Sequence, residues 1–345
     1  MLALMSNKKL VIVTIFLLCA GCIHEGTSAP SPSPRPSLQT KSDIGSTLIS
    51  GQQVRVNTQA NPVRLIPTKA LSFVDELHGY GLAASNDELT FLQTSDGGVS
   101  WQAKSKVTNQ AGPNLLSFLN TRIGWMFTGE TSTRKSELRL TSDEGQTWEV
   151  IAQDLPGLEG SRGTPYFRFF DRQKGLLAVR TEKDLQLIRT QDGGLTWGVS
   201  NRIPFPSKED GVFTFLSSTE GWFVGPSKKD KETMMLYHMT DGETWEEAGK
   251  WPSPGAPQAI SFSDAQNGFL LIKKNTSGVQ GQSWQWLQTK DGGKTWSQNE
   301  FPGTFQPLES KLQVSFPNST SGWLWDARDL WGTADGGLNW HLLTH

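Results

Sequence analysis

The stretch Thr190-Gln191-Asp192-Gly193-Gly194-Leu195-Thr196-Trp197 (TQDGGLTW) returns in close copies along the 345-residue chain. The copies are residues 94–101 (TSDGGVSW), 141–148 (TSDEGQTW), 289–296 (TKDGGKTW) and 333–340 (TADGGLNW), with a shortened copy at residues 239–245 (MTDGETW). In a repeat protein each unit is one supersecondary element that buries its apolar face against its neighbours. The stretch therefore predicts a fold built from six equivalent units.

A second motif precedes each copy at a strict spacing: phenylalanine, any residue, Asp, Asn or Ser, three more residues, then glycine and a bulky residue. Its instances are residues 73–80 (FVDELHGY), 118–125 (FLNTRIGW), 169–176 (FFDRQKGL), 215–222 (FLSSTEGW), 262–269 (FSDAQNGF) and 316–323 (FPNSTSGW). The polar third residue can bond the backbone that follows it, and we expect the glycine to adopt a turn geometry that other residues resist. The motif predicts a turn between two strands.

The two motifs together predict four antiparallel strands in each unit. Residues 185–190 (LQLIRT) place Leu185 and Leu187 on one face of a strand and Ile188 on the other, as expected when neighbouring sheets cover both faces. The D-G-G turn then reverses the chain, and the tryptophan after it returns to the apolar side. Four strands in roughly 45–50 residues match one blade of a β-propeller.

The sequence therefore predicts an all-β protein, a β-propeller of four-stranded antiparallel blades. The six expected blades are residues 68–110, 111–160, 161–207, 208–254, 255–308 and 309–345. The strand-like pieces 53–56 (QVRV) and 63–66 (VRLI) lie outside these units and are available as an added outer strand or as part of a further blade. Seven blades are the alternative.

The repeated stretch resembles the Asp-box, or BNR repeat, of sialidase-type β-propellers, and the similarity covers nearly all of residues 68–345. Its pairing with the phenylalanine-glycine motif looks more like the photosystem II stability/assembly factor-like family of exported propellers. That resemblance implies a scaffold or assembly role. The copy at residues 239–245 departs from the pattern, because Met239 stands at the first position and one glycine is missing before Glu243.

The aspartates and tryptophans of the six copies are candidate site residues, and we interpret them as structural. One aspartate in each blade occupies an equivalent turn around the ring, so the six do not converge on one centre, and a turn aspartate commonly bonds nearby backbone groups. The tryptophans are expected in the packing. These residues are Asp96, Trp101, Asp143, Trp148, Asp192, Trp197, Asp241, Trp245, Asp291, Trp296, Asp335 and Trp340.

The N-terminus carries the features of a secretory signal: Lys8 and Lys9, an apolar run over residues 10–18, and then Cys19-Ala20-Gly21-Cys22. The small residues before Cys22 resemble the lipobox of bacterial lipoproteins, although Cys19 stands where a leucine is expected. This resemblance implies lipid attachment at Cys22 and an extracytoplasmic protein anchored to a bacterial membrane. The alternative is ordinary cleavage that leaves Cys22 as a free thiol.

The expected organisation is a signal peptide at residues 1–21, a Pro/Ser-rich tether at residues 22–45 and the propeller at residues 46–345. Alternating proline and serine favour an extended chain that cannot bury a core. The formal net charge of -2 does not suggest nucleic acid as a partner. The five histidines show no paired ligand spacing and only one cysteine remains after cleavage, so we expect no metal and no cofactor.

We expect a membrane-tethered propeller that binds a protein or a cell-envelope ligand, acts as a scaffold or assembly factor, and is not an enzyme. The alternative is a sialidase-like glycoside hydrolase. Arg64 and Arg202 lie in fragments similar to the R-I-P signature of sialidases, and Tyr166 is the one tyrosine without a place in the repeat. A nucleophile also needs a base and an anion-binding group around it, and the sequence does not identify them.

Overall fold

The computed structural model describes residues 66–85, 88–108, 112, 114–129, 135–182, 184–204, 211–230, 232–274, 283–301, 305, 307, 312–326 and 328–343. The chain divides into two compact units, Met1–Gln59 and Ala60–His345, and the described residues all belong to the second. The predicted signal peptide, Cys22, the tether and the strand-like pieces at residues 53–56 and 63–65 lie outside the described residues. Among the described residues no helix is long and apolar enough to cross a membrane.

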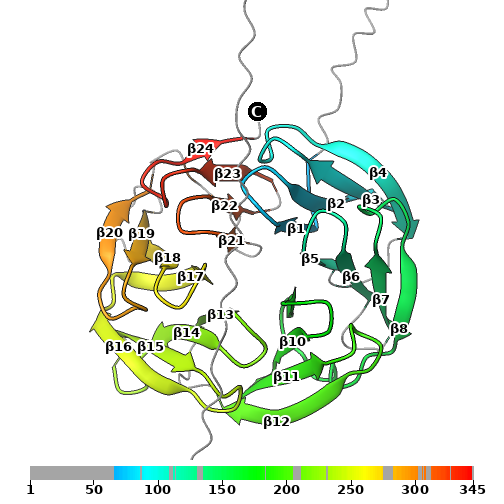
Figure 1. The fold of residues 1–345 in the computed structure, drawn as a ribbon. Coiled ribbons are helices and arrows are strands. Elements are labelled where there is room, and N and C mark those ends of the chain that lie inside the picture. Colours follow the sequence, from blue (N-terminus) through cyan, green and yellow to red (C-terminus); the bar gives the residue numbers. More distant parts are fainter. Residues whose placement is uncertain are drawn as a thin grey trace, which may run out of the picture. The chain divides into compact units, whose positions relative to one another are not determined.

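The described residues of the second unit form six four-stranded antiparallel sheets, and each sheet consists of four strands that are consecutive in the chain (Figure 1). The first three blades comprise β1 (Ala70–Phe73), β2 (Gly79–Ser85), β3 (Glu88–Thr94) and β4 (Gln102–Thr108); β5 (Asn114–Phe118), β6 (Gly124–Gly129), β7 (Ser136–Thr141) and β8 (Glu149–Gln153); β9 (Tyr166–Phe169), β10 (Gly175–Arg180), β11 (Asp184–Thr190) and β12 (Gly198–Pro204). The last three comprise β13 (Val212–Phe215), β14 (Gly221–Pro226), β15 (Thr233–Met239) and β16 (Glu246–Pro252); β17 (Gly255–Phe262), β18 (Gly268–Lys274), β19 (Trp284–Thr289) and β20 (Ser297–Glu300); β21 (Gln313–Ser315), β22 (Gly322–Trp325), β23 (Leu330–Thr333) and β24 (His341–Leu342). The predicted six-bladed, all-β propeller is confirmed, and each expected blade contains the four strands of one sheet.

The hydrophobic core is divided into six clusters, each shared by two neighbouring blades. At five of the six contacts, the motif phenylalanine stacks on the bulky motif residue of the preceding blade. Trp125 and Phe169, for example, lie with ring centroids 3.8 Å apart and an interplanar angle of 3°. Leu176 takes the place of this ring before the fourth blade and packs in the same cluster as Phe215. An aromatic pair of this kind contributes about 0.5–1.5 kcal/mol beyond the area it buries.

The motif glycine has a different role from the one predicted. It is followed by an extended strand, and its φ angle is not in the left-handed region at any of the six positions. A Cβ atom at Gly79 would lie 2.4 Å from the ring of Phe73, and one at Gly322 would lie 2.3 Å from the ring of Phe316. The prediction that this glycine is needed for its turn geometry is therefore wrong. It is needed because any side chain at this position would collide with the phenylalanine of its own motif.

The polar third residue of the motif bonds the backbone of its turn, as predicted. Asp75 accepts the N–H groups of Leu77 at 2.9 Å and His78 at 2.7 Å through Oδ1. Asn120, Asp171, Ser217, Asp264 and Asn318 accept the corresponding pair of N–H groups in the other blades. These side chains fix the turn between the first and second strands of each blade.

The first and last blades meet through side chains, at the place where blue and red strands lie side by side (Figure 1). The indole of Trp323 stacks on Phe73 with ring centroids 3.6 Å apart and donates a hydrogen bond to Gly97 O at 2.8 Å. Trp325 is 3% exposed and donates to Pro67 O at 3.1 Å. Among the described residues, the contact that closes the ring repeats the packing used between the other blades.

Candidate functional site

The predicted aspartates lie in the turns that connect the third and fourth strands of each blade. We call these turns the Asp turns (residues 94–101 and their five copies). In the third blade Asp192 accepts the Thr190 hydroxyl and the Thr196 N–H through Oδ1, at 2.8 and 2.9 Å, and the Thr196 hydroxyl through Oδ2 at 2.6 Å. The hydroxyl of Thr190 in turn accepts the N–H of Gly194 at 2.9 Å. These hydrogen bonds, with those from Thr196 first, lower the pKa of Asp192 to about 2 because they stabilise the ionised carboxylate.

Each regular Asp turn is also bonded to the phenylalanine-glycine turn of its own blade. Gly193 donates its N–H to Gln173 O at 2.9 Å. The same bond joins Gly97 to Leu77, Glu144 to Arg122, Gly292 to Gln266 and Gly336 to Thr320. The two motifs occur as a pair because both turns lie at the same end of the blade and complete each other's backbone hydrogen bonding.

The predicted tryptophans each contact one of the six inter-blade clusters. Trp101 and Trp340 are buried, whereas Trp148, Trp197, Trp245 and Trp296 are half-buried and pack against the edges of their clusters. The aspartates and tryptophans thus occupy six separate turns, and the structure brings them into no common site. Among the described residues, no group of three or more His, Cys, Asp or Glu side chains could hold a metal ion.

The fourth Asp turn is built differently from the other five, as its shortened sequence suggests. Met239 has no hydroxyl, and Asp241 accepts the N–H groups of Glu243 and Thr244, both at 2.8 Å. Arg189 reaches over from β11 of the third blade and donates to Gly242 O at 2.6 Å and to Ser218 O at 3.0 Å. Burial lowers the pKa of Arg189. Its guanidinium joins the two turns that a backbone N–H of the Asp turn joins in the other five blades.

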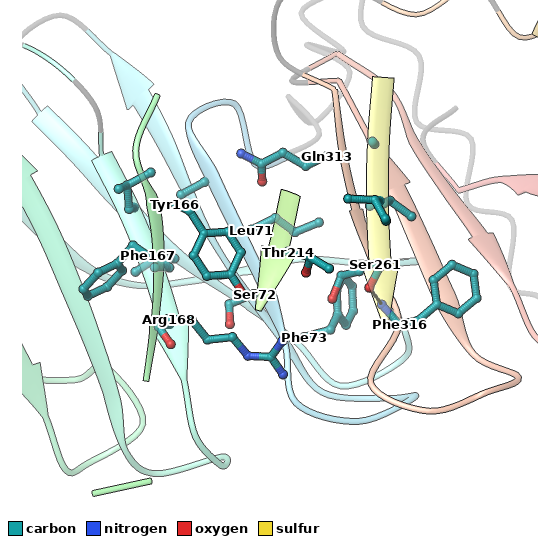
Figure 2. A pocket seen from close by; sticks show the side chains of 18 of the residues that line it. Leu71, Ser72, Phe73, Tyr166, Phe167, Arg168, Thr214, Ser261, Gln313 and Phe316 are labelled. Carbon is teal, nitrogen blue, oxygen red and sulfur yellow. Dashed lines mark hydrogen bonds between the residues drawn. The ribbon is translucent and has the colours of Figure 1, made fainter. Parts of the chain in front are cut away.

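A cavity of 580 Å³ lies where the first strands of the six blades meet, and residues of β1, β5, β9, β13, β17 and β21 line it (Figure 2). Its volume is within the range of small-molecule sites, about 300–1,000 Å³. The six residues immediately before the motif phenylalanines form a row along its wall, which we call the inner row. The inner row consists of Ser72, Ser117, Arg168, Thr214, Ser261 and Ser315.

Hydroxyl groups of the inner row connect neighbouring first strands. The Oγ atoms of Ser72, Ser117 and Ser261 accept the N–H groups of Phe118, Phe169 and Phe316, at 3.1, 2.8 and 3.3 Å. Each of these bonds joins one blade to the next at the centre of the ring. A small hydroxyl residue at this position is therefore part of the repeat.

Arg168 is the exception in the inner row, and it lies beside Tyr166 on β9. Arg168 donates through Nη1 to Phe215 O at 3.2 Å, and the hydroxyl of Tyr166 donates to the same carbonyl oxygen at 3.0 Å. Figure 2 shows the Arg168 side chain extending from β9 toward the middle of the cavity. Tyr166 is conspicuous in the sequence because it has no place in the repeat. Arg168 is conspicuous only when the residues preceding the six motif phenylalanines are aligned, and it was not predicted.

Arg202, the described arginine of the two in the sialidase-like fragments, does not line this cavity. Arg202 lies on the outer strand β12, has a side chain that is 58% exposed, and is 3.9 Å from Asp184 through its Nη1 atom. Arg64 lies outside the described residues. The described residues that line the cavity include no aspartate, glutamate or histidine, so they do not supply the carboxylate pair that most glycosidases use.

No family model matches the chain, and a search of curated proteins found no match. Solved structures with a similar fold include a GH74 enzyme of Niastella koreensis (15% identity, 79% of this chain and 46% of that chain covered, TM-score 0.47). Another is a GH74 xyloglucanase of Xanthomonas campestris (12% identity, 80% and 47% covered, TM-score 0.48). A third is an uncharacterised protein of Listeria monocytogenes (10% identity, 81% and 96% covered, TM-score 0.48).

The chain spans about half the length of the two GH74 enzymes, and at these identities the similarity concerns the fold alone. The comparisons correct the prediction that the protein is not an enzyme, because glycoside hydrolases are among the similar propellers and the fold gives no ground for that conclusion. The Asp-box and photosystem II assembly factor-like resemblance is matched by no family model and stays a prediction.

Proposed function

We propose that the protein is a binding propeller, tethered to a membrane on its extracytoplasmic side, whose ligand or protein partner enters the central cavity. Residues 1–21 are the signal peptide in this proposal, Cys22 carries the lipid, residues 22–45 are the tether and residues 46–345 include the propeller. The resemblance to Asp-box propellers of the photosystem II assembly factor-like family suggests a scaffold or assembly role for the complex that forms.

The observation that carries the proposal is the departure from the repeat at the cavity wall. Five residues of the inner row are small and hydroxylated, and the sixth is Arg168, whose long side chain extends into the cavity. Packing alone does not call for an arginine there, because serine or threonine serves at the five equivalent positions. A rigid scaffold that places one different side chain in a cavity is typical of a binding site.

The cavity also presents apolar surface to an incoming group. Leu71, Phe213 and Val314 line it and are only half-buried, unlike the fully buried side chains between the blades. Polar groups stand beside them, including the exposed side chain of Gln313 on β21. A wall that combines apolar and polar surface can hold a ligand that carries both kinds of group.

Capture of partners from detergent-solubilised membranes tests this proposal. The full-length protein is compared with Gln313→Trp, which fills part of the cavity from an exposed position, and with Glu149→Trp, a matched control at an exposed position of the outer strand β8. We expect a partner or ligand that is enriched by the wild type and by Glu149→Trp but not by Gln313→Trp. Equal capture by all three proteins, or enrichment of nothing over a lipoprotein without a propeller, would contradict the proposal.

A further inference from the structure

We infer that the central cavity binds an oxyanion, a carboxylate or a phosphate, through Arg168 and the hydroxyl groups of the inner row, and that an apolar part of the same ligand occupies the rest of the cavity. The inference rests on the proposed binding function and names the ligand class of that site.

The first observation is that the charge of Arg168 is not neutralised. Tyr166 aside, Arg168 is the one ionisable side chain among the described residues that line the cavity. Its single hydrogen bond is the one from Nη1 to Phe215 O, and within the described part of the chain its other N–H groups have no partner. The guanidinium lies 5.8 Å from the ring centre of Phe170, an additional contact that holds it in place without supplying a negative charge.

The second observation concerns the direction of the hydroxyl groups. Because Ser72, Ser117 and Ser261 each accept a backbone N–H through Oγ, the O–H proton of each is left to donate. No acceptor for these protons exists among the described residues. The inner row therefore presents several donors and one cation, and it offers no carboxylate acceptor, which suits an oxyanion and disfavours a cation.

The third observation is that the surroundings strengthen such a contact. Arg168 is half-buried in a cavity whose remaining wall includes Leu71, Phe213 and Val314, so less water competes for the guanidinium than at the outer surface. The planar guanidinium has N–H groups left for a two-point contact with an oxyanion. Tyr166 helps to position it, since both side chains donate to Phe215 O.

Three small probes test the inference in titrations of the full-length protein held in a nonionic detergent. Phenylacetate carries a carboxylate, phenyl phosphate carries a phosphate, and phenylacetamide has nearly the shape of phenylacetate without its charge. We expect one or both anions to bind and to raise the midpoint of thermal unfolding progressively as their concentration increases, whereas phenylacetamide binds at least ~10-fold more weakly. The anion that binds more tightly identifies the oxyanion class.

Variants of one residue locate the site. Arg168→Gln should weaken binding of the preferred anion at least ~10-fold, and Arg168→Lys should retain part of the affinity because it keeps the charge but loses the two-point contact. Arg172→Gln is the matched control, since Arg172 is exposed, lies four residues away in the same blade and does not line the cavity.

Equal binding of phenylacetate and phenylacetamide, binding of neither anion, or unchanged affinity in Arg168→Gln would overturn the inference. These results are distinguishable from failure of the proposed function. If a partner is still captured and is lost in Gln313→Trp, the cavity binds its partner, and only the assignment to an oxyanion is wrong.

Discussion

The Asp turn of the fourth blade and the inner row of the third blade are both departures from a sixfold repeat, yet they differ in what surrounds them. In the fourth Asp turn a hydroxyl and a glycine are missing, and Arg189 from the neighbouring blade bonds Gly242 O and Ser218 O in compensation. In the inner row Arg168 stands where the other five blades have serine or threonine. No acidic side chain lies among the described residues that line the cavity with it. A compensated departure maintains the fold, whereas an uncompensated one marks a candidate site.

The inter-blade packing next to the inner row should show the largest effect. Phe169 is 3% exposed, stacks on Trp125 and lies beside Arg168 in sequence. Phe169→Ala should lower the free energy of unfolding by about 3–5 kcal/mol, because it leaves a cavity between the second and third blades. Denaturant unfolding measures this loss. The control is Phe170→Ala, which truncates the half-buried neighbour and should lower the free energy of unfolding much less. Equal losses in the two variants would contradict the packing described here.

Removal of the compensating arginine should have the next largest effect. Arg189→Gln deprives two carbonyl oxygens of their donor, one of them on the buried Gly242, and should cost about 2 kcal/mol of unfolding free energy. The exposed Arg172→Gln loses the same charge in the same blade and should stay close to the wild type. A loss in Arg189→Gln no greater than in that control would show that Arg189 does not maintain the fourth turn.

A regular Asp turn should lose less when one hydroxyl is removed. Thr190 is 2% exposed, and Thr190→Val keeps its shape while removing the bonds to Asp192 and to the Gly194 N–H. We expect a loss of about 1–2 kcal/mol in unfolding free energy. Thr196→Val, at the exposed end of the same turn, should cost less, because water replaces its bond. The reverse order would mean that the buried hydroxyl does not hold the turn.

Acid should weaken the Asp turns gradually. The pKa values of Asp143, Asp192, Asp241 and Asp291 are lowered to about 2, mainly by hydrogen bonds from a threonine hydroxyl, against a usual value of 3.8. Since the folded pKa of about 2 lies below the unfolded value of 3.8, these groups contribute fully to stability only well above pH 3.8 and lose that contribution as the pH falls through 3.8 toward 2. Chemical unfolding at a series of pH values should show the decline begin below about pH 5.

The variant Asp192→Asn cannot lose this contribution by protonation and should show a shallower decline in the acid range. Glu149→Gln removes an exposed carboxylate from β8 and serves as the control. If the slope of stability with pH were the same in Asp192→Asn as in the wild type, the low pKa of Asp192 would not contribute to the acid response.

The fold was predictable because its information is local and repeated. Six paired motifs identified the blades, and the turn-forming side chain of Asp75 and its equivalents act within three residues of themselves. The glycine of the same motif was misinterpreted because its neighbour is a ring that only the folded turn places against it, such as Phe73 against Gly79. The spacing of the two residues in the sequence does not reveal that contact.

The candidate site was only half predictable. Tyr166 stood out because it has no place in the repeat, and Arg168 would have stood out in an aligned inner row. That the two side chains share Phe215 O and line one cavity depends on the closure of six blades around a centre. Arg189 was missed for a related reason, since its partners lie 29 and 53 residues away in the next blade.

A paired measurement on Arg168→Gln and Arg189→Gln tests the central claim most directly. For each protein, the free energy of unfolding and the affinity for the preferred anionic probe are determined under the same conditions. Arg168→Gln should unfold within about 0.5 kcal/mol of the wild type, because Tyr166 still donates to Phe215 O, and it should lose the anion. Arg189→Gln should lose stability and keep the anion's affinity. The opposite pattern, or a loss of stability without a loss of binding in Arg168→Gln, would contradict the distinction between the two arginines.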